Sequence, residues 1–465
     1  MKRALPLLLM LIWLNPLPRA EAAEAQVHVV CDYSHTLPDD AVMMPAMPGM
    51  AMSHDFFGNT HTNAYSTNEQ LVADFSTTCN NLADHSAYWA PSLRLPDGQV
   101  IRPAYQKTYY QATNVKEFPL SPFPAGLQLL AGTHNGTSPN KVAIDYFCQG
   151  LGYSDVPKSR CPPQADGTVQ MNIAIKFPNC WDGVTLHPAI GVRNADYAVN
   201  NACPAAYPVK LPTVNMNIAY LVPNSPPIDM TKVELSLDPK MVEGKVVEQW
   251  GSIYSAHADF MNGWPDQASD YMVNHCMNRA LDCGLNVPLA YEPALQDVTV
   301  SNQESAESNF AGSSTLVVQD NWQNDRSKNR EEVGLIQFAI PAWPAALDID
   351  KDTSFIYKVR LFGNNVSDSA SRQLFLYPTS NDWQEQAVTW NSRPSCGRDA
   401  DGKTQVTSKP SYLYFSVDAA VKRAIKNKQA TISFCIGGER QGRIYHFDAT
   451  ESGNPPLLIL LGVKK

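Results

Sequence analysis

The chain has 465 residues, a formal net charge of −9, a charged fraction of only 17% and 35 prolines. This length predicts two domains rather than one core, and the acidic charge excludes nucleic-acid binding through a basic face. Many prolines with few charges favour a mainly β fold with long ordered loops over a helical bundle.

The first 25 residues have the pattern of a secretory signal peptide. Lys2 and Arg3 precede the apolar run ALPLLLMLIWL, and small residues follow that allow cleavage after Ala22 or Ala25. The run is too short to span a membrane, and no later run of about 18 apolar residues follows, so we expect no membrane anchor in the mature chain. The sequence therefore predicts a secreted, extracellular protein, with the periplasm as the alternative.

Residues 26–53 form a lead-in segment that is rich in methionine. Thioethers are soft ligands that prefer Cu(I), which makes this segment a candidate copper site. The alternative is that the methionines fill an irregular groove, because their side chains are flexible. The candidate ligands are Met43, Met44, Met47, Met50, Met52 and His54. Zinc is less favoured, since the chain has no H-x-x-x-H pair.

A motif occurs twice in residues 54–285. Residues 53–59 read SHDFFGN, and residues 255–264 read SAHADFMNGW. Polar side chains beside phenylalanine are costly to bury unless they are paired, so we predict that the two copies meet in one cleft. The alternative is that these side chains satisfy buried loop backbone.

The candidate catalytic residues come from both copies of the motif. Asp55 and Asp259 would form a carboxylate pair for general acid–base chemistry, and His54 and His257 would assist them. If the cleft cleaves a sugar, the separation of the carboxylates bears on retention or inversion. Serine-triad catalysis has no support, because the chain has no G-x-S-x-G motif.

The candidate substrate-binding residues can donate hydrogen bonds or stack on a sugar ring. They are Asn59, Asn262, Trp264, Trp89, His85 and Asp182. For Asp182 a simple turn is the alternative, since Asp-Gly is an ordinary turn former.

The ten cysteines indicate disulfides in an exported protein. Only Cys396 and Cys435 lie beyond residue 290, so they pair if each domain closes its own bridges. Pairing between sequence neighbours is favoured for the other eight, although the sequence alone does not fix the connectivity. This gives Cys31–Cys79, Cys148–Cys161, Cys180–Cys203 and Cys276–Cys283.

The predicted elements change in character along the chain. The first domain is irregular, with strands at 142–148, 169–177 and 215–222 and a helix at 266–283. Residues 286–294 look like a linker. Short alternating strands follow from residue 295 at 315–319, 334–340, 355–363, 373–378, 412–417, 430–437 and 456–463, with one helix at 418–427. The fold class predicted is mainly β: an irregular disulfide-bonded N-terminal domain and a C-terminal antiparallel, jelly-roll-like β-sandwich.

Two families are recognisable from these motifs. Residues 54–285 resemble the family named domain of unknown function 1996 through HDFFGN, TTCNNLADHSAYWAPSLRLPDG, FPNCWDG, CPAAYPVKLP and HADFMNGWPDQ, in that order. Residues 295–465 resemble the DNRLRE-type β-sandwich, which includes carbohydrate-binding module family 96, chiefly through NDWQEQAVTWNSRP. The first resemblance implies a shared domain and no reaction. The second implies a domain that binds polysaccharide.

We therefore expect a secreted protein that binds an extracellular polysaccharide or a cell-surface glycan, and that cleaves it if the cleft is catalytic. A non-catalytic adhesin that binds glycan is one alternative. A periplasmic copper-binding protein that uses the methionine segment is the other. The sequence specifies no cofactor, no particular sugar and no oligomeric state.

Overall fold

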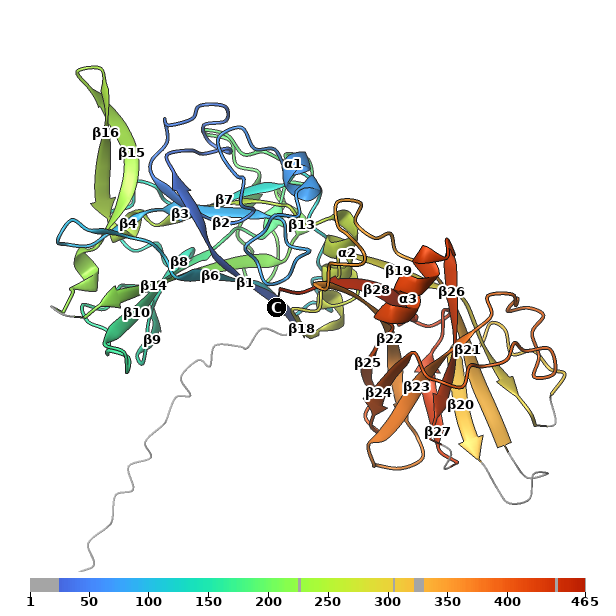
Figure 1. Ribbon diagram of the computed structural model, residues 1–465. Helices are drawn as coiled ribbons and strands as arrows, with labels where there is room; N and C mark the ends of the chain where they lie inside the picture. Colours follow the sequence, from blue (N-terminus) through green and yellow to red (C-terminus); the bar gives the residue numbers. More distant parts are fainter. Residues whose placement is uncertain (1–24, 225–226, 304–305, 322–329, 440–441, 465) are drawn as a thin grey trace, which may run out of the picture.

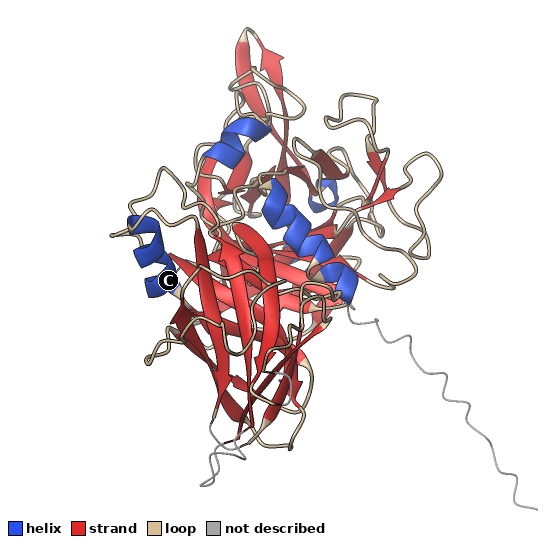
Figure 2. Ribbon diagram, turned by 90° about the vertical axis from the view of Figure 1, so that its right-hand side faces the viewer, coloured by secondary structure: helices blue, strands red, loops and turns tan. Residues whose placement is uncertain are grey.

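The computed structural model describes residues 25–224, 227–303, 306–321, 330–439 and 442–464. All but Ala25 of the predicted signal peptide lies outside the described residues. Figure 1 shows an N-terminal lobe (blue to green) beside a C-terminal lobe (yellow to red), with the end of the chain at their junction. Strands dominate both lobes and the helices are short (Figure 2), which confirms the mainly β prediction.

The N-terminal lobe is built on one eleven-stranded sheet. Its strands run in the order β7-β17-β3-β2-β1-β6-β14-β10-β8-β9, with β18 beside β1. Their bounds are β1 Ala25–Leu37, β2 His54–Gly58, β3 Ala87–Pro91, β6 Tyr105–Ala112, β7 Gln128–Gly132, β8 Ile144–Cys148, β9 Gly152–Ser154, β10 Thr168–Lys176, β14 Thr213–Pro223, β17 His257–Met261 and β18 Asp282–Gly284.

Strand β1 joins the two halves of this sheet. Its residues 25–32 pair with β6, and its last residues, from Tyr33, pair with β2. Buried and partly exposed residues alternate along its first half, as the period of two in a strand requires.

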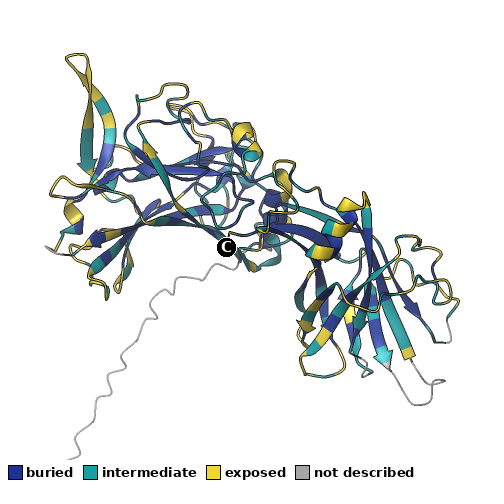
Figure 3. Ribbon diagram, viewed as in Figure 1, coloured by how far each residue is buried: buried dark blue, intermediate teal, exposed yellow. Residues whose placement is uncertain are grey.

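Two small sheets and short helices complete this lobe. One sheet contains β11 (Cys180–Trp181), β12 (Ala195–Asp196) and β13 (Val209–Lys210), and the other contains β4 (Leu93–Arg94), β5 (Val100–Ile101), β15 (Glu234–Val242) and β16 (Lys245–Ser252). The α-helices are α1 (Asn68–Ala73) and α2 (Asp266–Asn274), with 3-10 turns at Met230–Lys232, Ile253–Ser255 and Met277–Arg279. Figure 3 shows that the tip of the β15–β16 hairpin is exposed, whereas the central strands are buried.

The C-terminal lobe is a closed antiparallel β structure. Its path is β19-β28-β22-β27-β20-β21-β26-β23-β24, β25 pairs with β22, and β19 also pairs with β21, which closes a ring of strands. The bounds are β19 Ala290–Ser301, β20 Thr315–Asn321, β21 Arg330–Ala339, β22 Phe355–Asn365, β23 Arg372–Thr379, β24 Gly402–Val406, β25 Ser411–Ser416, α3 Asp418–Lys426, β26 Thr431–Gly438, β27 Ile444–Asp448 and β28 Leu457–Gly462.

The structure differs from the sequence expectations at the junction. The expected linker at 286–294 lies partly in strand β19, which begins at Ala290. The helix expected over 266–283 ends at Asn274, because Cys276 has non-helical backbone angles and Ala280 is left-handed. The Cys276–Cys283 disulfide closes this turn.

All five expected disulfides are present, which confirms the preference for sequence neighbours. They are Cys31–Cys79, Cys148–Cys161, Cys180–Cys203, Cys276–Cys283 and Cys396–Cys435.

The two lobes are held together by buried polar contacts. The end of β28 reaches the N-terminal lobe, where the amide of Leu82 donates to the carbonyl of Gly462 at 3.0 Å. Arg360, which is 1% exposed, donates to the hydroxyl of Tyr271 at 2.9 Å. A buried guanidinium without such partners would be strongly destabilising.

Candidate functional site

The two copies of the repeated motif form strands on either side of β3. Strand β2 pairs with one edge of β3 and β17 pairs with the other, both antiparallel. Phe56 and Asp259 both stand opposite Trp89. Directly opposed residues share a face of the sheet, so Phe56, Trp89 and Asp259 project on the same side.

The alternation of side chains then places the rest of each copy. His54 and His257 each lie two residues before a member of that row, so both project on the same face as Asp259. Asp55 lies one residue from His54 and projects on the opposite face. The packing agrees: Phe56 and Met261 belong to a cluster of buried apolar residues that does not contain Phe57.

Asp55 therefore does not form the expected pair with Asp259. Its Oδ1 accepts hydrogen bonds from Thr36 at 2.6 Å and from Ser92 at 3.1 Å. Burial raises the pKa of Asp55 to about 6. Hydrolysis by two facing carboxylates needs both on one side of a cleft, and this geometry does not supply them.

His54, His257 and Asp259 come together instead. One ligand atom of each lies within 4.8 Å of the others, and the two imidazole rings are 6.0 Å apart in an edge-to-face arrangement. His54 and Asp259 are each 1% exposed, whereas His257 is partly exposed.

The backbone fixes the tautomer of both histidines. Nδ1–H of His54 donates to the carbonyl of Asp39 at 3.0 Å, and Nδ1–H of His257 donates to the carbonyl of Ser255 at 2.8 Å. A carbonyl oxygen only accepts, so each Nδ1 carries the proton and each Nε2 keeps a lone pair. Burial lowers the pKa of His54 to about 4 and that of His257 to about 3, which keeps both rings neutral near pH 7.

Two polar atoms of the cluster lack a partner in the described part of the chain. Nε2 of His54 and Oδ1 of Asp259 are buried and have no hydrogen-bond partner among the described residues. Burial raises the pKa of Asp259, and the nearby carboxylate of Asp40 raises it further. A neutral Asp259 could donate to an imidazole, and an ionised Asp259 could bind a cation beside the two lone pairs.

The methionine segment lies over this same face of the sheet. Ala41 and Val42 pack with Phe56, Trp89 and Met261. The carboxylate of the neighbouring Asp39 holds the segment in place, because it accepts from the amides of Gly49 at 2.8 Å and Ala64 at 3.1 Å.

The five methionines themselves are in different environments. Met52 is 6% exposed, whereas Met47 and Met50 are 48% and 40% exposed. Met43 and Met44 are partly buried. The sixth candidate copper ligand, His54, joins the cluster with His257 and Asp259.

The asparagines of the motif shape turns. Oδ1 of Asn59 accepts from the amide of His61 at 2.9 Å, and Oδ1 of Asn262 accepts from the amide of Trp264 at 3.1 Å. Trp264 and Trp89 are 1% and 0% exposed, so neither offers a ring face to a sugar.

The other two substrate-binding candidates are also engaged with backbone. The ring nitrogens of His85 lie 3.1 Å and 2.9 Å from the carbonyl oxygens of Val72 and Leu82. Asp182 accepts from the amides of Val184 and Thr185, both at 2.8 Å. The contacts of the four polar candidates, Asn59, Asn262, His85 and Asp182, agree with the alternative interpretation, in which these side chains satisfy loop backbone and turns.

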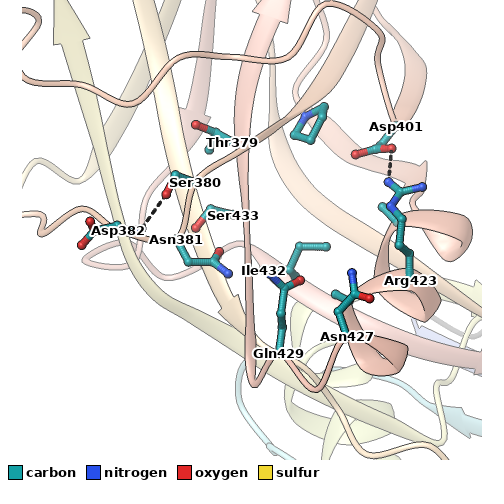
Figure 4. Close-up of a pocket in the computed structure, with 13 residues that line it drawn as sticks. Thr379, Ser380, Asn381, Asp382, Asp401, Arg423, Asn427, Gln429, Ile432 and Ser433 are labelled. Carbon is teal, nitrogen blue, oxygen red and sulfur yellow. Dashed lines mark hydrogen bonds and ion pairs between the residues drawn. The ribbon is translucent and has the colours of Figure 1, made fainter.

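A second candidate site is a polar pocket of about 370 Å³ in the C-terminal lobe. It lies between the segment after β23, the end of α3 and the start of β26 (Figure 4). Asn381, Asp401, Arg423, Asn427 and Gln429 line it. Sequence reasoning missed this site, because only Asn381 belongs to the motif NDWQEQAVTWNSRP and the other four residues come from separate segments.

Comparison with known families assigns both lobes. Residues 40–264 match the family model described as domain of unknown function (DUF1996), and residues 288–462 match carbohydrate-binding module family 96. The two matches occur in the order that the sequence motifs predicted. No curated protein matches the chain.

The two matches cover the two candidate sites. The DUF1996 match contains both copies of the motif, and the family 96 match contains the C-terminal pocket and indicates carbohydrate binding. Among the described residues, no helix is long and apolar enough to cross a membrane.

Proposed function

We propose that the protein is exported and binds an extracellular polysaccharide through its family 96 module, with the C-terminal pocket in contact with the sugar. The match of residues 288–462 to carbohydrate-binding module family 96 carries this proposal. The disulfides support export, because such bonds persist in oxidising compartments.

The chemistry of the pocket supports a hydroxyl-rich ligand. Oδ1 of Asn381 and Oδ2 of Asp401 are buried acceptors without a partner in the described part of the chain. The side chains of Asn427 and Gln429 are exposed beside them. Sugar hydroxyls both donate and accept, so they complement a set of this kind.

The pocket is also suitable in size. Its volume of about 370 Å³ falls in the range of small-ligand sites, roughly 300–1,000 Å³. Its described lining contains no aromatic ring, so binding rests on hydrogen bonds. Trp383, in the strongest motif of this region, is buried and donates from Nε1 to the hydroxyl of Ser433 at 3.2 Å.

The test is polysaccharide binding by the full chain. Native affinity electrophoresis against a panel of plant, fungal and bacterial polysaccharides would identify a ligand, and titration calorimetry with its oligosaccharides would give an affinity. We expect the double variant Asn427→Ala/Gln429→Ala to bind at least roughly tenfold more weakly, the effect of losing about 1.4 kcal/mol of hydrogen bonding.

A matched control is Gln386→Ala, which removes an exposed amide outside the pocket and should bind as the wild type does. If no polysaccharide retards the wild type, the proposed function is wrong. If a ligand is found but the double variant binds it unchanged, the pocket is not the binding site.

A further inference from the structure

The cluster of the N-terminal lobe lies outside the family 96 match, so an inference about it does not depend on glycan binding. We propose that His54, His257 and Asp259 hold one divalent first-row transition metal ion, of the zinc class. The proposal rests on the convergence of three side chains from two strands that are separated by about two hundred residues of sequence.

The spacing of the three ligand atoms suits one ion. They lie within 4.8 Å of one another. Ligands that share an ion at about 2.0–2.2 Å lie roughly 3–4 Å apart, so small side-chain rotations close the set. The strands that carry them are fixed on either side of β3 by the sheet.

The hydrogen bonds around the cluster are those that metal-binding histidines need. Such a histidine donates its other ring N–H to a carbonyl or carboxylate, which fixes the tautomer. His54 and His257 donate from Nδ1 to the carbonyls of Asp39 and Ser255. Both Nε2 lone pairs are therefore free to coordinate.

Two atoms of the cluster, one from His54 and one from Asp259, give independent evidence for a bound ion. Nε2 of His54 and Oδ1 of Asp259 belong to side chains that are 99% buried, and neither has a hydrogen-bond partner within the described ranges. An unsatisfied buried polar group destabilises the folded chain. A bound cation satisfies both atoms at once.

The donor set selects the class of metal. Two imidazoles and one carboxylate suit zinc and neighbouring divalent ions, whereas calcium and magnesium prefer oxygen alone. Cu(I) prefers the sulfur ligands that this set lacks. Three protein ligands leave a position for water, and of the three only His257 is partly exposed.

The surroundings fit a bound ion as well. The carboxylate of Asp40 is close enough to interact electrostatically with His257 and Asp259, and it adds negative charge. Phe56 stands edge-on to His54 with ring centroids 6.3 Å apart. Phe56 packs in a buried apolar cluster with Trp89 and Met261, which share its face of the sheet, and an apolar shell of this kind restricts solvent around a metal site.

The test is metal binding by the full mature chain after treatment with a chelator. Competition between the protein and a chromogenic chelator for Zn²⁺ gives the stoichiometry and affinity. We expect one zinc ion per chain, no competition from Ca²⁺ or Mg²⁺, and a loss of zinc affinity of roughly 100-fold or more in His257→Ala and Asp259→Asn.

Two controls separate ligand loss from general effects. Asp55→Asn changes the carboxylate of the other motif copy, on the opposite face of the sheet, and His446→Ala removes an exposed imidazole from the other lobe. Both should bind zinc as the wild type does. Circular dichroism of each variant shows whether it is folded.

Cobalt gives a readout that does not depend on affinity. Co²⁺ bound by two imidazoles and a carboxylate should show d–d absorption bands in the wild type and Asp55→Asn, and these bands should be absent in folded Asp259→Asn. A wild type that binds neither zinc nor cobalt would overturn the proposal. So would folded His257→Ala and Asp259→Asn that bind both ions as tightly as the wild type.

Discussion

The two copies of the motif differ by one residue in the spacing between histidine and aspartate. That residue decides on which face of the sheet the aspartate projects. In β2 the histidine and the aspartate are adjacent, at 54 and 55, so they project on opposite faces. In β17 Ala258 separates His257 from Asp259, so both project on one face. Only the second copy therefore brings its carboxylate to the histidines.

The parts that the copies share are structural. Asn59 and Asn262 each cap an amide two residues ahead. The glycines meet the same neighbouring backbone: a Cβ on Gly58 would lie 2.1 Å from the carbonyl oxygen of Ser86, and a Cβ on Gly263 would lie 2.4 Å from the carbonyl carbon of His85. The repeated motif therefore marks two strands, β2 and β17, that both end opposite Ala87 of β3.

The largest effect on stability is expected from adding a Cβ atom at either of these glycines, where neighbouring backbone lies too close to admit one. Gly58→Ala and Gly263→Ala should each lower the free energy of unfolding by more than about 3 kcal/mol, because backbone must move and Gly58 also has a φ of +78°. Urea denaturation measures this, and failure to fold also agrees. Gly453→Ala, where nothing lies within 4 Å, is the control. Equal stability in all three would refute the shared role.

The face opposite the cluster should show its own pH dependence. On it Tyr88 donates to Asp84, and burial raises the pKa of Asp84 to about 6. A pKa above the unfolded value of 3.8 contributes stability below about pH 4 that is lost as pH rises through 6.

The free energy of unfolding of the wild type, relative to Asp84→Asn, should therefore fall by up to about 3 kcal/mol from pH 4 to pH 7. Urea denaturation of both proteins at each pH checks this difference. Parallel curves for the two proteins would contradict it.

The two asparagines of the motif, Asn59 and Asn262, should contribute equally to the stability of the fold. Asn59→Ala and Asn262→Ala each remove the acceptor for a turn amide and should lower the free energy of unfolding by about 1–2 kcal/mol. Thermal denaturation of the pair tests this, with the exposed Asn135→Ala as a control that should change little. A large effect in one copy alone would show that the copies are not equivalent.

The smallest effect is expected from shortening the two phenylalanines that project on opposite faces of β2. Phe56→Leu and Phe57→Leu should each cost about 1–2 kcal/mol, since both side chains are buried. Of the two phenylalanines, Phe56 is the one whose ring lies edge-to-face with that of His54, so Phe56→Leu should shift the imidazole signals of His54 in NMR spectra and Phe57→Leu should not. A comparable shift in Phe57→Leu would contradict the assignment of faces.

The features that sequence predicted well depend on local or near-local patterns. The strands at 142–148, 169–177 and 215–222 correspond to β8, β10 and β14, and the helix at 418–427 corresponds to α3. Alternation and helical spacing are visible in short windows. The disulfides follow because short loops pair readily within a folding domain.

The site was harder to predict because the sequence analysis expected no strand at either copy of the motif. His54 to Gly58 and His257 to Met261 are buried central strands, and in strands adjacency means opposite faces. The spacing His257-Ala258-Asp259 was the available signal. The contacts of Asp39 with His54 and of Asp40 with His257 gave no such signal. Contacts made by loops follow no periodic pattern in the sequence.

The sequence by itself determined the β class and the order of the two families, and it favoured the cysteine pairs that the structure contains. It also determined that His257 and Asp259 share a face once they form a strand. Only the tertiary structure decided that β2 and β17 flank β3 in the register that sets Phe56 and Asp259 opposite Trp89. A slip of one residue in β2 would have turned Asp55 toward the cluster and His54 away from it.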